Sequence, residues 1–337
     1  MPRRVDLRSD TVTQPTDAMR EAMSKAVVGD VGYDEDPTIN ELERRFAGIV
    51  GKESAIFVPS GVMANQIAVR VLTSPGDVIV AGRSQHVVSF EMGASARNSS
   101  VQFALIDDAK GILRADEVLD VIDAEHDHQP HVAIVAIENT HMLSGGTPWE
   151  LDDVNALKRA IGSLPLHLDG ARLFNASVAT GISASDLSAP ATTVTACLSK
   201  GLGAPVGSLL AGPTDVMHRA SIERKRLGGT MRQAGFLAAA GIVALETMIE
   251  RLGDDHVRAR VLAEEFAKAF PESSYDPSSC RTNIVAFDHP RARDIVEELS
   301  SKGVLGGTVA PRRVRFVTHL GVNDDDVDFV SDILAHL

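Results

Sequence analysis

Cysteine is scarce in this chain, which has only Cys197 and Cys280 among 337 residues. Two cysteines cannot form a disulfide framework, and no spacing of cysteine and histidine matches a zinc site. Long apolar runs are also missing, since no segment reaches 18 uninterrupted apolar residues, and this argues against a transmembrane helix. The basic N-terminal residues precede no apolar stretch, so we expect no signal peptide. We therefore expect a cytoplasmic protein with reduced thiols, no bound metal and no membrane contact.

Positive charge and aromatic side chains are scarce as well. The formal net charge of −13 argues against binding to a nucleic-acid backbone, which requires a basic face. Aromatic residues make up only 4% of the chain, so the core must consist mostly of Ala, Val, Ile and Leu. That composition favours α/β layers over a β-sandwich. We expect a metabolic protein that binds a small molecule in a local basic pocket.

Short apolar segments alternate with longer helical patterns over the first two thirds of the chain. Each apolar segment is rich in Val and Ile and ends near Gly, Asp or Pro, which is typical of buried strands. The expected strands are 55–61, 77–82, 101–106, 132–138, 165–170, 193–199 and 207–212, and the expected helices are 38–51, 62–73, 86–96, 115–124 and 150–162. Because the strands lack period-two alternation, we predict an α/β fold with a mainly parallel sheet covered by helices on both faces.

The pattern changes after about residue 213. Helices are expected over 213–226, 233–252, 254–270, 290–302 and 323–336, and strands over 283–288 and 312–318. This order predicts a small C-terminal α+β domain. We place the boundary in 245–255, which gives a large domain 1–248, with an N-terminal arm 1–15, and a small domain 249–337.

Polar residues of reactive types follow several of the expected strands. They are Ser60 and Gly61, then Glu138, Asn139 and His141, then Asp169 and Arg172, and finally Lys200. Because ligands bind at the carboxyl ends of strands in open α/β sheets, these residues predict one shared site.

The turn "PSGVMANQ" (59–66) would direct the amides of a helix N-terminus at an anion such as a phosphate. Alternatively, Ser60 is an ordinary helix cap. Asp169 ends an apolar strand, where a carboxylate needs a cation or a donor. It is either the ion-pair partner of Arg172 or an acid that holds a proton on a heterocycle nitrogen.

Lys200, in "CLSKGLGAP", stands between an apolar run and a series of small residues. A loop lysine usually reaches solvent, but a desolvated lysine is an amine nucleophile suited to Schiff-base chemistry. A phosphate cup, a strand-end acid and a buried lysine are together the three parts that pyridoxal phosphate requires.

Three further segments offer candidate residues. His86 begins a helix and either caps it or stacks on a planar ring, and "HDHQPH" (126–131) is a polar loop rather than a metal site. Arg232 lies in the glycine turn "GGTMRQAG". Arg315, in the alternating strand "RRVRFVTH", is a candidate for bidentate binding of a substrate carboxylate, whereas Arg312 and Arg313 are expected on the surface.

Eight segments in this order resemble the L-threonine aldolases of the β-eliminating lyase group, which are fold-type I pyridoxal-phosphate enzymes. They are "DLRSDTVTQPT", "DEDPTINELE", "PSGVMANQ", "IENTH", "HLDGARLFNA", "CLSKGLGAPVGSLLAG", "GGTMRQAG" and "VRFVTH". The resemblance covers nearly the whole chain. It implies an aspartate aminotransferase-like three-layer large domain, a small C-terminal domain and pyridoxal 5'-phosphate as the cofactor.

The resemblance also implies a role for individual residues. Lys200 forms the Schiff base, Asp169 pairs with the pyridine nitrogen and His86 stacks on the ring. The phosphate is held by Ser60, Gly61, Val62 and Arg232, with Lys225 nearby and reaching in from a partner subunit. The substrate is bound by Ser9, Arg172, Arg315 and Tyr33, and by His128 near its hydroxyl group, with His131 as the rival of His128. This chain departs from the family at Val62, where Thr is usual, and in the loops "GYDEDP" and "AEHDHQPH".

The implied reaction is the retro-aldol cleavage of L-threonine or L-allo-threonine to glycine and acetaldehyde. The base is His128, or His86 acting through water. The alternatives are a related lyase for phenylserine-type or 3-hydroxyaspartate-type substrates, elimination at Cβ, and a non-catalytic pyridoxal-phosphate-binding protein. The resemblance further implies a homo-oligomer with sites at a two-fold interface, at least a dimer and, as in the family, a tetramer.

Overall fold

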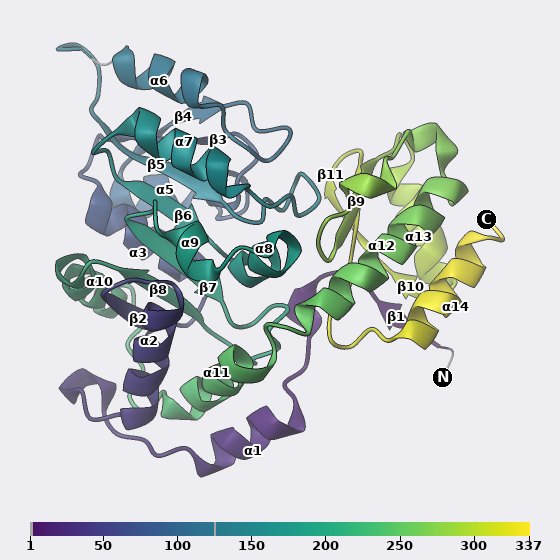
Figure 1. Cartoon of the computed structure of the whole chain (residues 1–337), viewed down its shortest axis with the longest axis horizontal. Helices are drawn as coiled ribbons and strands as arrows, with labels where there is room; N and C mark the ends of the chain where they lie inside the picture. Colours follow the sequence, from purple (N-terminus) through teal and green to yellow (C-terminus); the bar gives the residue numbers. More distant parts are fainter. Residues whose placement is uncertain (1–2, 125) are drawn as a thin grey trace.

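The computed structural model describes residues 3–124 and 126–337, which form two units side by side (Figure 1). The large unit contains a seven-stranded sheet, and the small unit contains a three-stranded antiparallel sheet. The predicted α/β class with a small C-terminal α+β part is confirmed. Among the described residues, no helix combines the length and the apolar character needed to span a membrane.

The large sheet has the strand order β2-β8-β7-β6-β5-β3-β4. Its strands are β2 (Ser54–Val58), β3 (Val78–Gly82), β4 (Gln102–Ile106), β5 (Val132–Glu138), β6 (Leu166–Asp169), β7 (Thr193–Cys197) and β8 (Ser208–Gly212). β8 runs antiparallel to both neighbours, and the other pairs are parallel. Strands β3 and β5 to β8 are buried along their whole length, which explains their continuous apolar sequences.

Helices cover both faces of this sheet. The helices of the large unit are α1 (Asp17–Lys25), α2 (Pro37–Ile49), α3 (Gly61–Leu72), α4 (His86–Ser89), α5 (Ala94–Ser99), α6 (Ala115–Asp123), α7 (Leu151–Ile161), α8 (Leu173–Thr180), α9 (Ala184–Ser188), α10 (Thr214–Arg226) and α11 (Gly235–Thr247). Side chains of α3 and α10 pack on one face of β2 and β8, and those of α2 pack on the other. The result is the three-layer arrangement that the sequence predicts.

The single helix predicted over 86–96 is wrong, because the structure divides this segment into α4 and α5. Met92 and Gly93 separate the two helices with φ angles of 54° and 70°, in the left-handed region. The helix predicted over 233–252 also ends earlier, at Thr247, and the next begins at Leu252. Helices α1, α8 and α9 are additional to the prediction.

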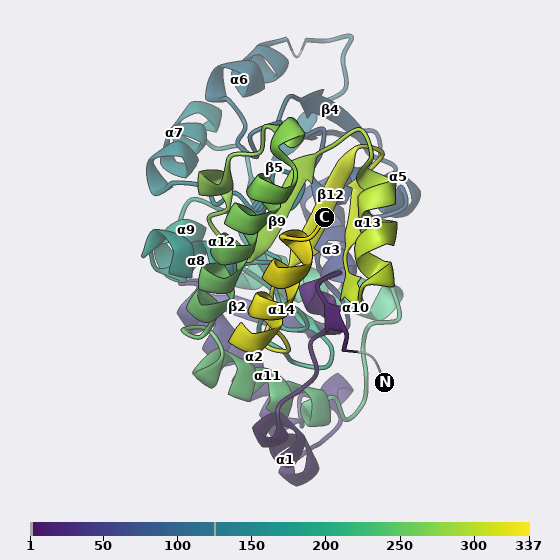
Figure 2. The ribbon, with the colours of Figure 1, turned by 90° about the vertical axis from the view of Figure 1, so that its right-hand side faces the viewer.

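The small unit is built around stacked phenylalanines, with Phe266 lying 4.3 Å from Phe316 and 5.7 Å from Phe287 between ring centroids. Its elements are α12 (Leu252–Ala269), β9 (Ile284–Asp288), α13 (Ala292–Ser301), β10 (Val304–Leu305), β11 (Gly307–Ala310), β12 (Arg313–Val317) and α14 (Asp324–Leu334). In Figure 2 this unit faces the viewer, with the N-terminal segment beside it. Strand β1 (Val5–Asp6) pairs with β10, so the start of the predicted N-terminal arm contacts the small unit and not only the large one.

Candidate active site

A cavity of about 160 Å³ lies at the carboxyl ends of β6 and β7. Its lining combines residues that the sequence predicts for one site with several that it does not: Pro59, Ser60, Gly61, Val62, Asn65, His86, Asp169, Ala171, Cys197, Ser199 and Lys200. A second cavity of about 260 Å³ shares His86 and Lys200 with the first. The two cavities therefore adjoin along these two side chains.

The N-terminus of α3 forms one wall of the first cavity. Ser60 caps the helix by accepting a hydrogen bond from the Met63 amide at 3.2 Å, so the cap interpretation is confirmed. A Cβ atom at position 61 would lie 2.8 Å from the Cys197 sulfur, so only glycine fits without a shift of the Cys197 side chain. The free amides and the positive dipole end of α3 make this wall suitable for a phosphate.

Asp169 is buried below the cavity and does not pair with Arg172, so that alternative is wrong. Its carboxylate accepts hydrogen bonds from Asn65 Nδ2 at 2.7 Å and from the Ala171 amide at 3.1 Å. Burial acts to raise the pKa of Asp169, but His86, Lys200 and Asn65 outweigh it and hold the pKa below its ordinary value. The carboxylate is therefore ionised and can hold a proton on a heterocycle nitrogen.

The Asn65 amide is itself held in place from below. Its Oδ1 atom lies 3.1 Å from His167 Nε2, and His167 Nδ1 lies 2.9 Å from the Thr193 hydroxyl. Burial lowers the pKa of His167 to about 4, so this imidazole is neutral at physiological pH. A neutral His167 donates from Nε2 to Asn65 and thereby directs the Asn65 NH₂ group toward Asp169.

Lys200 follows β7 and is half-buried, while the next four residues are fully buried. No hydrogen bond or ion pair of its ammonium group is found within residues 3–124 and 126–337. The small residues after Lys200 let the chain turn under the cavity, and Gly203 has a φ angle of 76°. Lys200 is thus available for a Schiff base, and together with the α3 N-terminus and Asp169 it fits pyridoxal phosphate.

His86 begins α4 and lines both cavities. Its backbone amide donates to the buried Glu138 carboxylate at 2.7 Å, and its Nδ1 atom lies 3.0 Å from Glu91 Oε1. Its ring stacks on Phe90 with 5.7 Å between centroids. Two buried carboxylates therefore fix the position of this imidazole.

Two arginines line the second cavity. Arg172 forms a bidentate ion pair with Asp10, with distances of 2.8 and 2.7 Å, and both side chains are buried. Arg315 donates to the Arg8 carbonyl at 3.0 Å, and its Nε atom is buried without a hydrogen-bond partner. Burial and the neighbouring Arg172 lower the pKa of Arg315 to about 10. An anion bound here would satisfy the unpaired donor, and Ser9 lines the same cavity.

The remaining predicted residues do not line these two cavities in a single chain. His128 is exposed in the loop between α6 and β5, so the seven residues of β5 separate it from the carboxyl end of that strand. His131 also lies in this loop. Tyr33 and Lys225 are exposed, and Arg232 is an exposed residue whose Nη1 atom lies 3.4 Å from Asp30.

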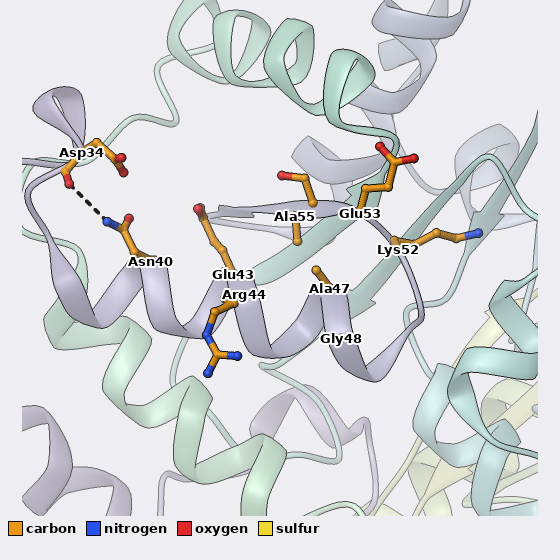
Figure 3. Close-up of a pocket in the computed structure, with 10 residues that line it drawn as sticks. Asp34, Asn40, Glu43, Arg44, Ala47, Gly48, Lys52, Glu53 and Ala55 are labelled. Atoms are coloured by element: carbon orange, nitrogen blue, oxygen red, sulfur yellow. Dashed lines mark hydrogen bonds between the residues drawn. The ribbon is translucent and has the colours of Figure 1, made fainter.

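A larger surface hollow, of about 600 Å³, lies elsewhere, over α2 and the start of β2 (Figure 3). Several of its polar side chains already have protein partners. Glu43 accepts hydrogen bonds from the Phe57 amide and Arg224, and Asn40 donates to the Asp34 carbonyl. This hollow therefore lacks the convergent free groups of the Lys200 site.

Among the polar residues of the site that escaped the sequence prediction are Asp10, Asn65 and Glu91. Asn65 and the adjacent Gln66 form a buried polar pair in the otherwise apolar helix α3, and that pair was the available signal. Asp10 stands within "DLRSDTVT", but its partner Arg172 is 162 positions away. The distance in sequence hid this contact.

A model of the beta-eliminating lyase family matches residues 6–289. The chain belongs to this family. It is 40% identical over 335 residues to the low specificity L-threonine aldolase of Escherichia coli K12, with 98% of each chain covered. Among solved structures, the threonine aldolase of Leishmania major aligns with a TM-score of 0.82 at 18% identity, over 98% of each chain.

The family membership confirms the resemblance drawn from the sequence motifs. A structure of SPT that holds pyridoxal phosphate shares the fold, with a TM-score of 0.73 at 15% identity over 99% of this chain and 87% of that one. The chain is therefore a lyase of fold type I, and its cofactor is pyridoxal phosphate.

Proposed function

We propose that this lyase cleaves the Cα–Cβ bond of L-threonine, L-allo-threonine and related β-hydroxy-α-amino acids, releasing glycine and an aldehyde, which is acetaldehyde for threonine. The observation that carries the proposal is that the Lys200 cavity opens onto a second cavity with two arginines. The names of the related threonine aldolases support the same reaction. A protein that only binds the cofactor has no need of the second cavity.

Each wall of the first cavity has a role toward the cofactor. The amides at the start of α3 and the Ser60–Gly61 turn would hold the phosphate, and the Lys200 amine would anchor the cofactor at its aldehyde group. Asp169 would keep the ring nitrogen protonated, because its own carboxylate stays ionised. When bound, the cofactor supplies an electron sink for the negative charge that remains on Cα.

The second cavity orients the substrate. Arg315 and Arg172 bind the carboxylate, with Ser9 beside them, so that the amino group is directed toward Lys200. Holding the carboxylate and the amine fixes rotation about the Cα–N bond. With both groups held, the Cα–Cβ bond would be oriented for cleavage when the cofactor is bound.

A base must remove the proton from the β-hydroxyl group as the bond breaks. His86 lies on the border between the two cavities, and its Nε2 atom accepts this proton directly or through a water molecule. Within one chain His128 lies in the exposed α6–β5 loop, so a role for His128 requires that it come from another copy.

We also propose a homo-oligomer, at least a dimer and by analogy with the family a tetramer, in the cytoplasm. Tyr33, Lys225 and Arg232 are exposed and line neither of the two cavities in a single chain. A partner subunit would bring such residues to the phosphate end of its neighbour's cavity.

The proposal is tested by time courses with L-threonine, L-allo-threonine and their D isomers, with acetaldehyde followed by coupled reduction and glycine measured in the same samples. We expect glycine and acetaldehyde in equal amounts from the L isomers. A keto acid and ammonia in their place would identify an elimination, and the proposed reaction would then be wrong.

A further inference from the structure

Glu91 is a buried carboxylate beside the site that the proposed reaction does not yet use. It is only 3% exposed, and three side chains donate to it or lie within hydrogen-bond distance. His86 Nδ1 lies 3.0 Å from Oε1, Asn65 Nδ2 lies 2.8 Å from Oε1, and Gln66 Nε2 lies 2.7 Å from Oε2. A buried carboxylate surrounded in this way by donors is held in one orientation.

The backbone is shaped to turn Glu91 inward. It lies between α4 and α5, next to Met92 and Gly93, whose φ angles are 54° and 70°. A non-glycine residue such as Met92 adopts that region only at an energetic cost. Met92 itself is 98% exposed, so the turn buries the carboxylate of Glu91 rather than the apolar side chain beside it.

The contact with Glu91 determines which nitrogen of His86 can act as a base. A carboxylate accepts hydrogen bonds, so the Nδ1 atom of His86 carries the hydrogen. The Nε2 atom then holds the lone pair, and it has no hydrogen-bond partner in the described part of the chain. A fixed tautomer with a free Nε2 is what a general base requires.

We propose that Glu91 is a positioning residue that fixes the tautomer of His86 and strengthens Nε2 as the base of the reaction. The inference deepens the proposed function and rests on it. Asn65 links the two ends of the site, because its NH₂ group donates both to Glu91 and to Asp169 at 2.7 Å. The Asn65 amide thus contacts both Glu91, which orients His86, and Asp169, which would face the cofactor nitrogen.

The charges around His86 determine the direction of its titration. Burial lowers its pKa, whereas Glu91 and Asp169 raise it and Lys200 lowers it, and the net result is a pKa above the ordinary value of 6.5. Glu138 lies at its backbone amide, and Arg172 and Arg315 lie across the second cavity. Removal of the Glu91 charge should therefore lower the pKa of His86.

The first test is the pH dependence of kcat/KM for L-threonine in the holoenzyme. Because neutral His86 is the active form, the rate rises with pH, and in the Glu91→Gln variant we expect this rise to move to lower pH. We expect kcat at high pH to fall by about tenfold, as for a weakened general base, with KM little changed. The control is Glu272→Gln, which removes an exposed carboxylate that pairs with a buried histidine, 2.9 Å from His289 in the small unit, and should leave the profile unchanged.

A second readout does not depend on activity. Diethyl pyrocarbonate modifies neutral imidazole, and cleavage by trypsin after Arg83 and Arg97 gives a peptide, 84–97, that contains His86 as its single histidine. The rate of modification of this peptide in the holoenzyme, measured against pH by mass spectrometry, gives the pKa of His86. We expect a lower midpoint in Glu91→Gln and an intermediate one in Glu91→Asp, which keeps the charge and serves in place of Glu91→Gln if that variant does not fold.

The two readouts separate the inference from the proposed function. If threonine is cleaved but both midpoints equal those of the wild type, Glu91 does not position the base. If threonine is not cleaved but the modification midpoint moves as expected, the effect of Glu91 on His86 is supported and the proposed reaction is wrong.

Discussion

At the scale of single residues, two guanidinium groups meet at the substrate end of the site and differ in their pairing. Arg172 is matched by Asp10, and both are buried. Arg315 has only the Arg8 carbonyl, and its buried Nε atom has no partner among the residues described. A buried donor without a partner costs free energy, and a substrate carboxylate would remove that cost. Arg315 is therefore the side chain that we expect to contribute most to substrate affinity.

Replacement of Arg315 by lysine tests this expectation. Lysine keeps the charge but loses the planar pair of donors, so we expect KM for L-threonine to rise by at least about tenfold, the equivalent of a charge-assisted hydrogen bond. The cofactor absorbance should not change, because Arg315 lines only the second cavity. Steady-state kinetics provide the measurement, and Arg312→Lys, at an exposed position of the same segment, is the control. A KM equal to that of the wild type would contradict the assignment.

At the scale of elements, the division between α4 and α5 determines where His86 and Glu91 point. Gly93 adopts a left-handed φ of 70° with open space around its Cα, and Gly76 is similar, with a φ of 95° and open space. The two glycines thus have similar backbone needs, but only Gly93 adjoins the site. They form a matched pair for separating strain from function.

Alanine at either glycine should destabilise the fold by about 1–2 kcal/mol, because a Cβ atom is unfavourable at positive φ. Only Gly93→Ala should also lower kcat, since a shift of this turn moves Glu91 away from His86. Thermal unfolding and threonine cleavage, measured on both variants, provide the comparison. Equal kcat values in the two variants would show that the turn does not position the base.

Buried strands and the reactive residues at their ends could be predicted from the sequence, whereas the break between α4 and α5 could not. β5 and β8 were located because a buried strand gives a continuous apolar run, and Asp169 and Lys200 were located because reactive residues at strand ends are conspicuous. The break at Met92 was missed because the neighbouring Glu91 is bound to Asn65, which lies 26 positions earlier. Local periodicity carries no record of such a contact.

At the scale of the whole molecule, the second cavity lies between the two units. Thr308, Val309 and Arg315 come from the small unit, whereas His86 and Lys200 come from the large one. Asp10 joins them, since it binds Arg172 and also accepts a hydrogen bond from Asn283 at 3.2 Å. The N-terminal segment, which the sequence assigned to the large domain, thus connects both units, and sequence patterns alone could not show this long-range pairing.

The exposed residue Arg232, which we propose binds the cofactor phosphate of a neighbouring subunit, leads to a prediction about assembly. If Arg232 acts in the site of a partner, then Lys200→Ala and Arg232→Ala subunits should restore activity when they are co-expressed with different tags. A mixed dimer contains one site with both defects and one intact site, so the mixture should reach about a quarter of the wild-type activity, by the symmetry of a two-fold dimer. Activity no higher than the mean of the two parent variants would show that Arg232 acts within its own chain.

The central claim is that Lys200 carries the cofactor for threonine cleavage. The most direct test is the rate of glycine and acetaldehyde formation from L-threonine by Lys200→Ala, compared with the wild type under saturating cofactor. We predict that the wild type absorbs at about 420 nm, as Schiff bases of this cofactor do, and loses this band on borohydride reduction. We predict that the variant lacks the band and cleaves threonine at least about a thousandfold more slowly. A variant that cleaves threonine at the normal rate would contradict the account.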